Sequence, residues 1–297
     1  MVSGRQPAFS VVVPTYRRPS QLRTTLWTVS RCKPLPREVV VVDGDSDPAV
    51  RRIVEEANAG GGMELARYLR SAPGGNRQRN AGIRACIGDV VVFLDDDVRV
   101  EPDLFARLAA TYDDVDVVGA TGRVVEPQRR RRWNRYSRLR RWLPGAGKEG
   151  TFTRYGYPIY IRDANVGRDV EYMVGCFMSA RRHVLESVRF DDDLSTPGQD
   201  VDFSYRLSRH GRLRYVPEIT VYHEKTGFST RSSREYDQRL LRNSFYLFRK
   251  NFEQTPLARF QFGVFVLLLF LHRAANRDFG GLRGLAEGLA AVWRQPR

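Results

Sequence analysis

The chain has 297 residues, of which 42% are hydrophobic and 28% are charged. This composition excludes a disordered or fibrous protein, and the length suits one large α/β domain or a domain with an appendage. The formal net charge is +15, and only four of the 49 basic residues are lysines. Such a surface attracts phosphate groups, whether in a nucleotide, a nucleic acid or an anionic lipid.

The cysteines and the N-terminal sequence indicate the cellular compartment of the protein. Cys32, Cys86 and Cys176 are odd in number and lack metal-ligand spacing, which predicts reduced thiols facing the cytosol. The first apolar run, at 11–13, stops at Pro14, so no signal peptide is expected.

Three strand–helix units are predicted in the first hundred residues. The strands are expected at 9–13, 38–42 and 63–69, and the helices at 20–32, 48–57 and 78–87. Strands that alternate with helices of this length predict right-handed crossovers and a parallel sheet. The first half is therefore expected to be an α/β domain of a nucleotide-binding type.

Three consecutive aspartates follow the most apolar stretch of the first half. Residues 90–94 read VVVFL, and Asp95, Asp96 and Asp97 come directly after them. Carboxylates this close resist ionisation unless a cation or several donors lie among them. Mg2+ and Mn2+ prefer oxygen ligands, and open α/β sheets bind ligands at the carboxyl ends of their strands. The sequence therefore predicts a divalent metal site here, with a solvated acidic turn as the alternative.

Polar side chains also follow each of the three earlier strands. They are Thr15, Tyr16 and Arg18, then Asp43 and Asp45, then Asn76, Arg77, Arg79 and Asn80. Carboxylates bind base edges or ribose hydroxyls, and guanidinium groups bind diphosphates. Each residue alone also fits a turn or a helix surface. Their recurrence at the same edge of the sheet favours a nucleotide-binding crevice.

The second half contains a predicted helix that begins with carboxylates. Pro197 and Gly198 precede a helix expected to span about 12 residues, with Asp200 and Asp202 in its first turn. The helix dipole favours carboxylates at this position. An ordinary helix start therefore explains both, and for Asp202 it is the preferred interpretation.

Two further features of this half have open interpretations. A second acidic triplet at 191–193 is predicted to be a loop anchored by Phe190 and Leu194. His223 closes a valine-rich strand. A lone histidine at a strand end is usually structural, and metal ligation is the alternative.

Six sequence blocks resemble the family-2 glycosyltransferases of the GT-A fold. They are SVVVPTYRRP, EVVVVDGDSDP, GGNRQRNAGI, GDVVVFLDDDV, VGCFMSARR and GQDVDFSYRLSRHGRLRYVPEITVYHE. Each block alone is weak, but six in order are specific. The resemblance implies an α/β fold of the GT-A (Rossmann-like) type, a three-layer sandwich around a mostly parallel sheet with C-terminal helices. It implies a nucleotide-sugar half at 1–98, an acceptor half at 99–228 and a helical region at 229–297.

The resemblance also implies roles for single residues. Asp200 matches the general base, and Asp97 and His223 match metal ligands. The strand-end pattern and the resemblance together give the expected donor-binding positions, which are Pro14, Thr15, Tyr16, Arg18, Asp43, Asp45, Arg79, Asn80, Asp95 and Asp96. The acceptor-side positions are Gly175 and Gln199. The family usually has Glu-Asp where this chain has Gln199-Asp200, which removes one carboxylate from the surroundings of the base.

The implied activity is a metal-dependent, inverting sugar transfer. The donor is a nucleoside-diphosphate sugar, with UDP-sugars favoured, and the acceptor is a hydroxyl of a glycan or a lipid-linked molecule in cell-envelope synthesis. Mn2+ or Mg2+ and Arg79 would neutralise the departing diphosphate while Asp200 deprotonates the acceptor. No nucleic acid is expected as a partner.

Three stretches predict contact with a membrane. Residues 129–141 hold eight arginines with interleaved aromatic residues, which suits an anionic membrane surface or a solvated loop. The apolar run 260–271 is predicted to be too short to span a bilayer, which needs about 20 residues. It is expected to lie in the interface or against the domain, and an amphipathic stretch at 282–293 favours the interface. The expected location is therefore peripheral, on the cytoplasmic face of the cell membrane.

Two other classes of protein remain open. VVFLDDDV also fits the DxDxV start of haloacid-dehalogenase-type phosphatases, although that motif is expected near the N-terminus and with a later catalytic lysine. The net charge and the Arg/Trp/Tyr segment also fit a nucleic-acid-binding protein. That interpretation leaves the placement of the carboxylates unexplained.

Overall fold

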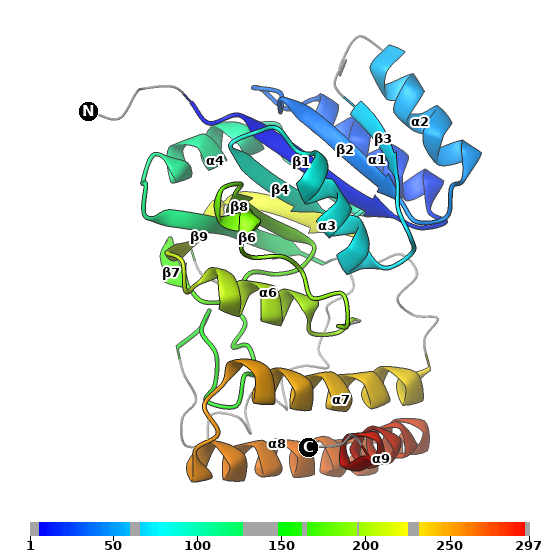
Figure 1. Ribbon diagram of the computed structural model, residues 1–297, viewed down its shortest axis with the longest axis vertical. Helices are drawn as coiled ribbons and strands as arrows, with labels where there is room; N and C mark the ends of the chain where they lie inside the picture. The colour runs from blue at the N-terminus through cyan, green and yellow to red at the C-terminus, as the bar shows by residue number, and fades with distance from the viewer. Residues whose placement is uncertain are drawn as a thin grey trace.

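The computed structural model describes residues 6–59, 66–126, 148–161, 165–194, 196–224 and 232–294. A central sheet with helices on both faces forms one part, and three long C-terminal helices form a layer at one end of it (Figure 1). The predicted basic segment 129–141 lies outside the described residues.

The first half alternates strands and helices as predicted. Its elements are β1 (Phe9–Thr15), α1 (Pro19–Ser30), β2 (Glu38–Asp43), α2 (Pro48–Ala59), β3 (Ala66–Arg70), α3 (Gly75–Ala85) and β4 (Val90–Leu94). The strands pair in parallel in the order β3-β2-β1-β4. The predicted third helix was placed three residues late, because Gly74 adopts a φ of +132° and the helix starts directly after it.

The second half adds mainly antiparallel strands. Its elements are β5 (Val98–Val100), α4 (Leu104–Tyr112), β6 (Val117–Val125), β7 (Arg168–Val170), β8 (Phe177–Arg181), η1 (Val184–Glu186), α6 (Gln199–Leu207) and β9 (Arg212–His223). The strand order is β3-β2-β1-β4-β8-β6-β9-β5, with β7 paired to β9. β4·β8, β6·β8, β5·β9 and β7·β9 are antiparallel, whereas β6·β9 is parallel. The sheet is therefore mixed rather than purely parallel.

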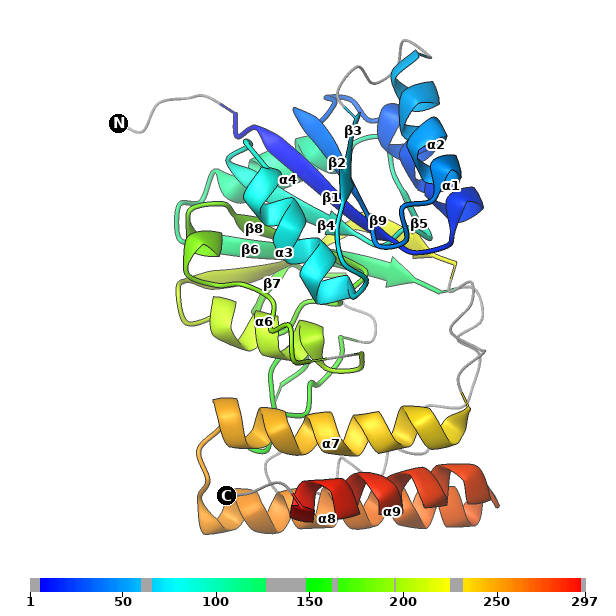
Figure 2. The same ribbon diagram turned by 45° about the vertical axis from the view of Figure 1, so that its right-hand side comes forward.

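Two apolar cores lie on the two faces of this sheet. Successive side chains of a strand point to opposite faces, so Val11 and Val13 enter one core and Val12 enters the other. The first core packs against α1, α2 and α4, and the second packs against α3 and α6, which gives three layers (Figure 2). Each fully buried valine contributes about 1.5 kcal/mol to this packing.

The C-terminal layer consists of α7 (Ser233–Asn251), α8 (Pro256–Ala275) and α9 (Phe279–Arg294). Side-chain hydrogen bonds cap the N-termini of the first two helices. The Ser232 side chain accepts a hydrogen bond from the N–H of Glu235, and the Thr255 side chain accepts one from the N–H of Ala258. In both views α7 lies between α6 and the other two helices (Figures 1 and 2). The division of the chain at 98 and 229 stays a prediction.

The length of α8 corrects one expectation. The run 260–271 was predicted to be too short to span a bilayer, but it belongs to a helix of 20 residues. Among the described residues this is the one helix that is long and apolar enough to cross a membrane by length and composition, with a mean hydropathy of 1.4. The prediction was wrong because the helix extends four residues beyond the apolar run at each end.

Candidate active site

Three metal-ligating side chains meet at the end of β4. Asp95 and Asp97 follow that strand, and the pairing of β5 with β9 places His223 opposite Val98. One ligand atom from each of the three residues lies within 4.8 Å of the others. Ligands around an octahedral Mg2+ or Mn2+ lie roughly 3 to 4 Å apart, so a small closure would fit such an ion. Two carboxylate oxygens and one imidazole nitrogen are donors that these ions accept.

Two arginines form ion pairs with the three aspartates after β4. Arg18 Nη1 lies 2.9 Å from Asp96 Oδ1 and 3.1 Å from Asp97 Oδ2. Arg79 Nη2 lies 2.6 Å from Asp95 Oδ1. Asp96 and Asp97 are only 4% and 5% exposed. The alternative of a solvated acidic turn is therefore wrong.

Asp96 points into the protein and joins two strand ends. Its Oδ2 accepts a hydrogen bond from the Thr15 hydroxyl at 2.8 Å. Burial raises the pKa of Asp96 to about 6, although Arg18 and Thr15 favour the charged form. Because Thr15 ends β1, this contact fixes the end of β1 against the end of β4.

His223 is held between two carboxylates. Its Nε2 lies 3.1 Å from Asp97 Oδ1, and its Nδ1 lies 3.6 Å from Glu126 Oε1. Burial lowers the pKa of His223, but Asp97, Cys176 and Glu126 outweigh burial and raise it well above the ordinary value. Sequence patterns did not indicate Glu126. It lies where a carboxylate commonly orients a metal-binding imidazole.

The loop after β2 carries the predicted donor-binding carboxylates. Asp43 is fully buried and accepts the backbone N–H groups of Asp45 and Asp47, each at 2.9 Å, and the Tyr68 hydroxyl at 3.0 Å. Asp45 is more exposed and pairs with Arg17 at 2.8 Å. Asp43 therefore shapes the turn that presents Asp45.

Helix α3 fastens the loop that precedes α6. Asn80 donates to the carbonyl of Phe190 at 2.8 Å and accepts its N–H at 2.9 Å. Asn76 donates to the carbonyls of Asp191 and Leu194. Phe190 and Leu194 are buried, which confirms the predicted loop anchors. The structure thus brings Asn80 to this loop rather than to the carboxylates after β4.

Asp200 is anchored by three donors at the start of α6. Its Oδ2 accepts the Tyr172 hydroxyl at 2.6 Å and the Gly175 N–H at 3.3 Å. Its Oδ1 accepts the N–H of Val201 at 3.0 Å. Burial raises the pKa of Asp200, while these hydrogen bonds favour its charged form. Gly198, the residue before α6, adopts a φ of +116°, which favours glycine.

One dipeptide links Asp200 to the metal-ligating group. Gly175 donates to Asp200, and the next residue, Cys176, accepts the backbone N–H of Asp95 at 3.2 Å. A Cβ at Gly175 would lie 3.2 Å from the Asp200 side chain, so glycine permits this close approach. The side chain of Asp200 and the backbone of Asp95 are therefore hydrogen-bonded to the same two residues.

Asp202 was predicted to be an ordinary charged residue at the start of a helix, but its surroundings differ from that prediction. It is fully buried and accepts hydrogen bonds from Arg206 Nε and Asn251, each at 2.9 Å. Lys250 Nζ lies 2.9 Å from its Oδ1. The prediction was wrong because α7 covers this side of α6. The carboxylate joins the α/β part to the helical layer.

The remaining predicted positions lie at the edges of this region. Pro14 is half-buried near the end of β1. Tyr16 is exposed, and the Arg17 guanidinium lies over its ring, 5.0 Å from the ring centre. Gln199 opens α6, and its buried Oε1 has no hydrogen-bond partner among the described residues.

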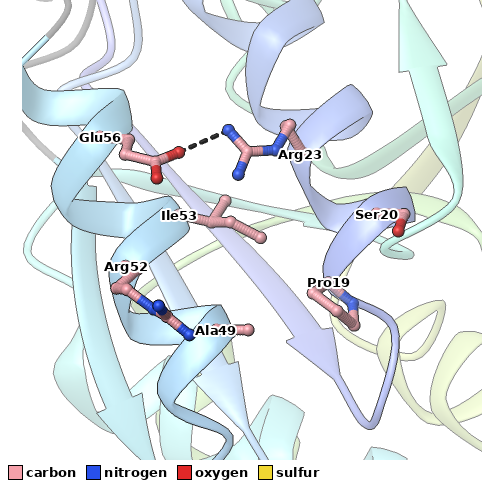
Figure 3. Close-up of a pocket in the computed structure, with 7 residues that line it drawn as sticks. All are labelled: Pro19, Ser20, Arg23, Ala49, Arg52, Ile53 and Glu56. Atoms are coloured by element: carbon pink, nitrogen blue, oxygen red, sulfur yellow. Dashed lines mark hydrogen bonds and ion pairs between the residues drawn. The ribbon is translucent and has the colours of Figure 1, made fainter.

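A separate hollow of about 260 Å³ lies between α1 and α2 (Figure 3). Arg23 and Glu56 form an ion pair across it at 2.5 Å. None of its lining residues belongs to the site predicted from the sequence.

A mixed sheet with helices on both faces and an acidic strand end beside a histidine defines a GT-A fold. The structure resembles the mannosyltransferase PcManGT from Pyrobaculum calidifontis in complex with GDP-Man and Mn2+. The TM-score is 0.58 at 18% identity, over 99% of this chain and 77% of that one. Residues 7–245 match the model of the family described as glycosyltransferase-like family 2. The chain belongs to this family.

Two curated relatives match parts of the chain. The undecaprenyl-phosphate 4-deoxy-4-formamido-L-arabinose transferase of Proteus mirabilis is 34% identical over 119 residues, 38% of this chain and 36% of the relative. The pre-mycofactocin glycosyltransferase of Mycobacterium tuberculosis is 29% identical over 217 residues, 72% of this chain and 42% of the relative. The chain thus spans less than half the length of either relative.

These comparisons confirm the predicted family and the GT-A fold. Membership of this family favours sugar transfer over the two alternatives, a phosphatase and a nucleic-acid-binding protein.

Proposed function

We propose that the protein is a metal-dependent, inverting glycosyltransferase of the hexosyltransferase class. It moves a sugar from a nucleoside-diphosphate sugar, with a UDP-sugar as the favoured donor, to a hydroxyl of a glycan or lipid-linked acceptor in cell-envelope synthesis. The observation that carries the proposal is the convergence of Asp95, Asp97 and His223 next to Asp200.

Asp95, Asp97 and His223 would hold Mn2+ or Mg2+. The bound ion supplies Lewis-acid neutralisation of charge on the diphosphate. The Mn2+ bound to the structurally similar mannosyltransferase supports this assignment.

Arginine and carboxylate side chains bind the donor. Arg79 keeps a buried Nε without a hydrogen-bond partner among the described residues, so its guanidinium has a donor to offer the diphosphate. Asp45, at the exposed end of its turn, binds the ribose or the base. These contacts orient the sugar with its anomeric carbon toward Asp200.

Asp200 accepts the proton of the acceptor hydroxyl. The oxygen attacks the anomeric carbon from the face opposite the diphosphate, the bond from that carbon to the phosphate oxygen breaks, and the configuration inverts. A hydroxyl needs such a base because it stays protonated at neutral pH, whereas a phosphate monoester is already ionised. The anchored carboxylate therefore favours a hydroxyl over a phosphate as the acceptor group.

Release of nucleoside diphosphate tests the proposal. The protein is incubated with a panel of nucleotide sugars, Mn2+ and either hydroxyl or phosphate acceptors. Asp97→Ala and Asp200→Asn should each abolish transfer to the hydroxyl acceptor, the second without loss of donor binding. Asp116→Asn, on the exposed turn before β6, is the matched control and should be fully active. Full turnover by Asp200→Asn would refute the base assignment.

We further propose that the C-terminal layer contacts the anionic inner face of the cell membrane. Helix α8 exposes Leu257, Phe260, Leu267 and Leu271, and Phe260 is 68% exposed. The name of the Proteus mirabilis relative, an undecaprenyl-phosphate transferase, supports the lipid part of the proposed acceptor but not its hydroxyl group. Phe260→Ser should reduce co-sedimentation with anionic vesicles, because it removes apolar area from the interface. Equal sedimentation of both proteins would contradict this contact.

A further inference from the structure

Three tyrosines from three segments surround Asp200. Tyr172 follows β7, Tyr160 lies in the stretch 148–161, and Tyr236 belongs to α7. The Tyr172 hydroxyl donates to Asp200 Oδ2 at 2.6 Å. Tyr160 packs edge-on against Tyr172, with ring centres 5.3 Å apart, and shares a hydrogen bond with it. Tyr236 interacts electrostatically with the same carboxylate.

The two oxygens of Asp200 are used differently. Oδ2 accepts both the Tyr172 hydroxyl and the Gly175 N–H, whereas Oδ1 accepts only the Val201 N–H among the hydrogen bonds of the described chain. The 2.6 Å distance is typical of a hydroxyl donating to a charged carboxylate. Oδ1 therefore retains the capacity to accept one more proton.

We propose that Tyr172 is a positioning residue for Asp200, whose hydroxyl holds Oδ2 so that Oδ1 faces the acceptor. This inference rests on the proposed role of Asp200 as the base. The rigidity of the contact comes from packing: Tyr172 is buried in a cluster with Leu194, Val201 and Leu247. Leu247 belongs to α7, so the C-terminal layer supports the orientation of the base.

The hydroxyl also sets the basicity of Asp200. A neutral phenol that donates to a carboxylate stabilises its charged form, in opposition to the burial that raises its pKa. Among the described residues, burial and the charge of Asp200 both raise the pKa values of the phenols of Tyr172, Tyr160 and Tyr236, which face this carboxylate. Removal of the Tyr172 hydroxyl therefore raises the pKa of Asp200 further.

The test compares two tyrosine-to-phenylalanine variants. Tyr172→Phe should move the acid limb of the kcat profile to higher pH by about one unit, so that at a fixed pH on this limb kcat falls about tenfold, with the donor KM unchanged. Tyr112→Phe is the matched control, because that buried hydroxyl bonds to Ser179 at 2.9 Å and lies outside the site. It should leave the acid limb in place. An acid limb that stays in place in Tyr172→Phe would overturn the inference.

Two further variants keep the outcome decisive. Tyr160→Phe leaves the contact between Tyr172 and Asp200 intact but removes a partner of Tyr172, so it should move the limb in the same direction by less. If Tyr172→Phe does not fold, an unmoved limb in Tyr160→Phe overturns the inference.

Asp200→Asn separates the two proposals. An active Asp200→Asn refutes the base, whereas an inactive Asp200→Asn with an unmoved limb in Tyr172→Phe refutes only the role of Tyr172.

Discussion

The substitution Lys250→Met tests the junction between α6 and α7. Lys250 Nζ lies 2.9 Å from Asp202 Oδ1 and 2.5 Å from Asp191 Oδ2. Asp202 is fully buried, so the substitution leaves a buried carboxylate with Arg206 as its remaining cation. Breaking a buried pair by removing one partner costs about 3–5 kcal/mol.

The expected loss of stability is smaller than that range. The Lys250 side chain is 29% exposed, and Arg206 still neutralises Asp202. We therefore expect the free energy of unfolding to fall by about 2 kcal/mol, which lowers the Tm by about 5 °C in a protein of this size.

The assay is urea unfolding followed by circular dichroism. Arg249→Met is the matched control, because Arg249 is the exposed neighbour of Lys250 on the same helix, and it should change the stability by less than about 0.5 kcal/mol. Adding Asp202→Asn to Lys250→Met should recover most of the loss, because the buried charge is then gone. A double variant less stable than Lys250→Met would refute the argument.

The remaining predictions concern packing and the thiols. Gly82→Ala should destabilise the protein by about 2 kcal/mol, because the new Cβ would lie 2.4 Å from Val12 Cγ1. Gly263→Ala in α8 should stabilise it by up to about 1 kcal/mol, because the new Cβ would meet no atom within 4 Å. Thermal unfolding measures both changes. A stability order opposite to this would contradict the packing of α3 on β1. Burial raises the pKa values of Cys32 and Cys86 to about 12 and also raises that of Cys176, so at pH 8 all three thiols should resist a disulfide reagent until the protein is unfolded. Rapid reaction of one thiol in the folded protein would show that this burial is incomplete.

The sequence predicted the features that depend on local patterns. The valine-rich strands and the helices between them were located to within a few residues, because each strand is buried on both faces. The acidic triplet was recognised because charge follows an apolar strand directly. The antiparallel strands were harder to predict: β5 and β7 are three residues each, VRV and RDV, and have no apolar run.

The partners of the candidate site depend on tertiary packing. Tyr172 lies 28 positions before Asp200. Glu126 directly follows β6, whereas His223 ends β9, so no spacing in the sequence relates either pair. Asp202 has the sequence of an ordinary helix start, and only the packing of α7 over α6 buries it. Asn80 follows a strand end at which donor contacts were predicted, yet its amide hydrogen-bonds to the Phe190 backbone.

Binding of Mn2+ tests the central claim most directly. Free Mn2+ is measured by electron paramagnetic resonance while protein is added in the presence of a nucleoside diphosphate. We expect the protein to bind one ion, Asp97→Ala to lose this binding, and Asp116→Asn to keep it. Unchanged binding by Asp97→Ala would show that Asp95, Asp97 and His223 do not form the metal site.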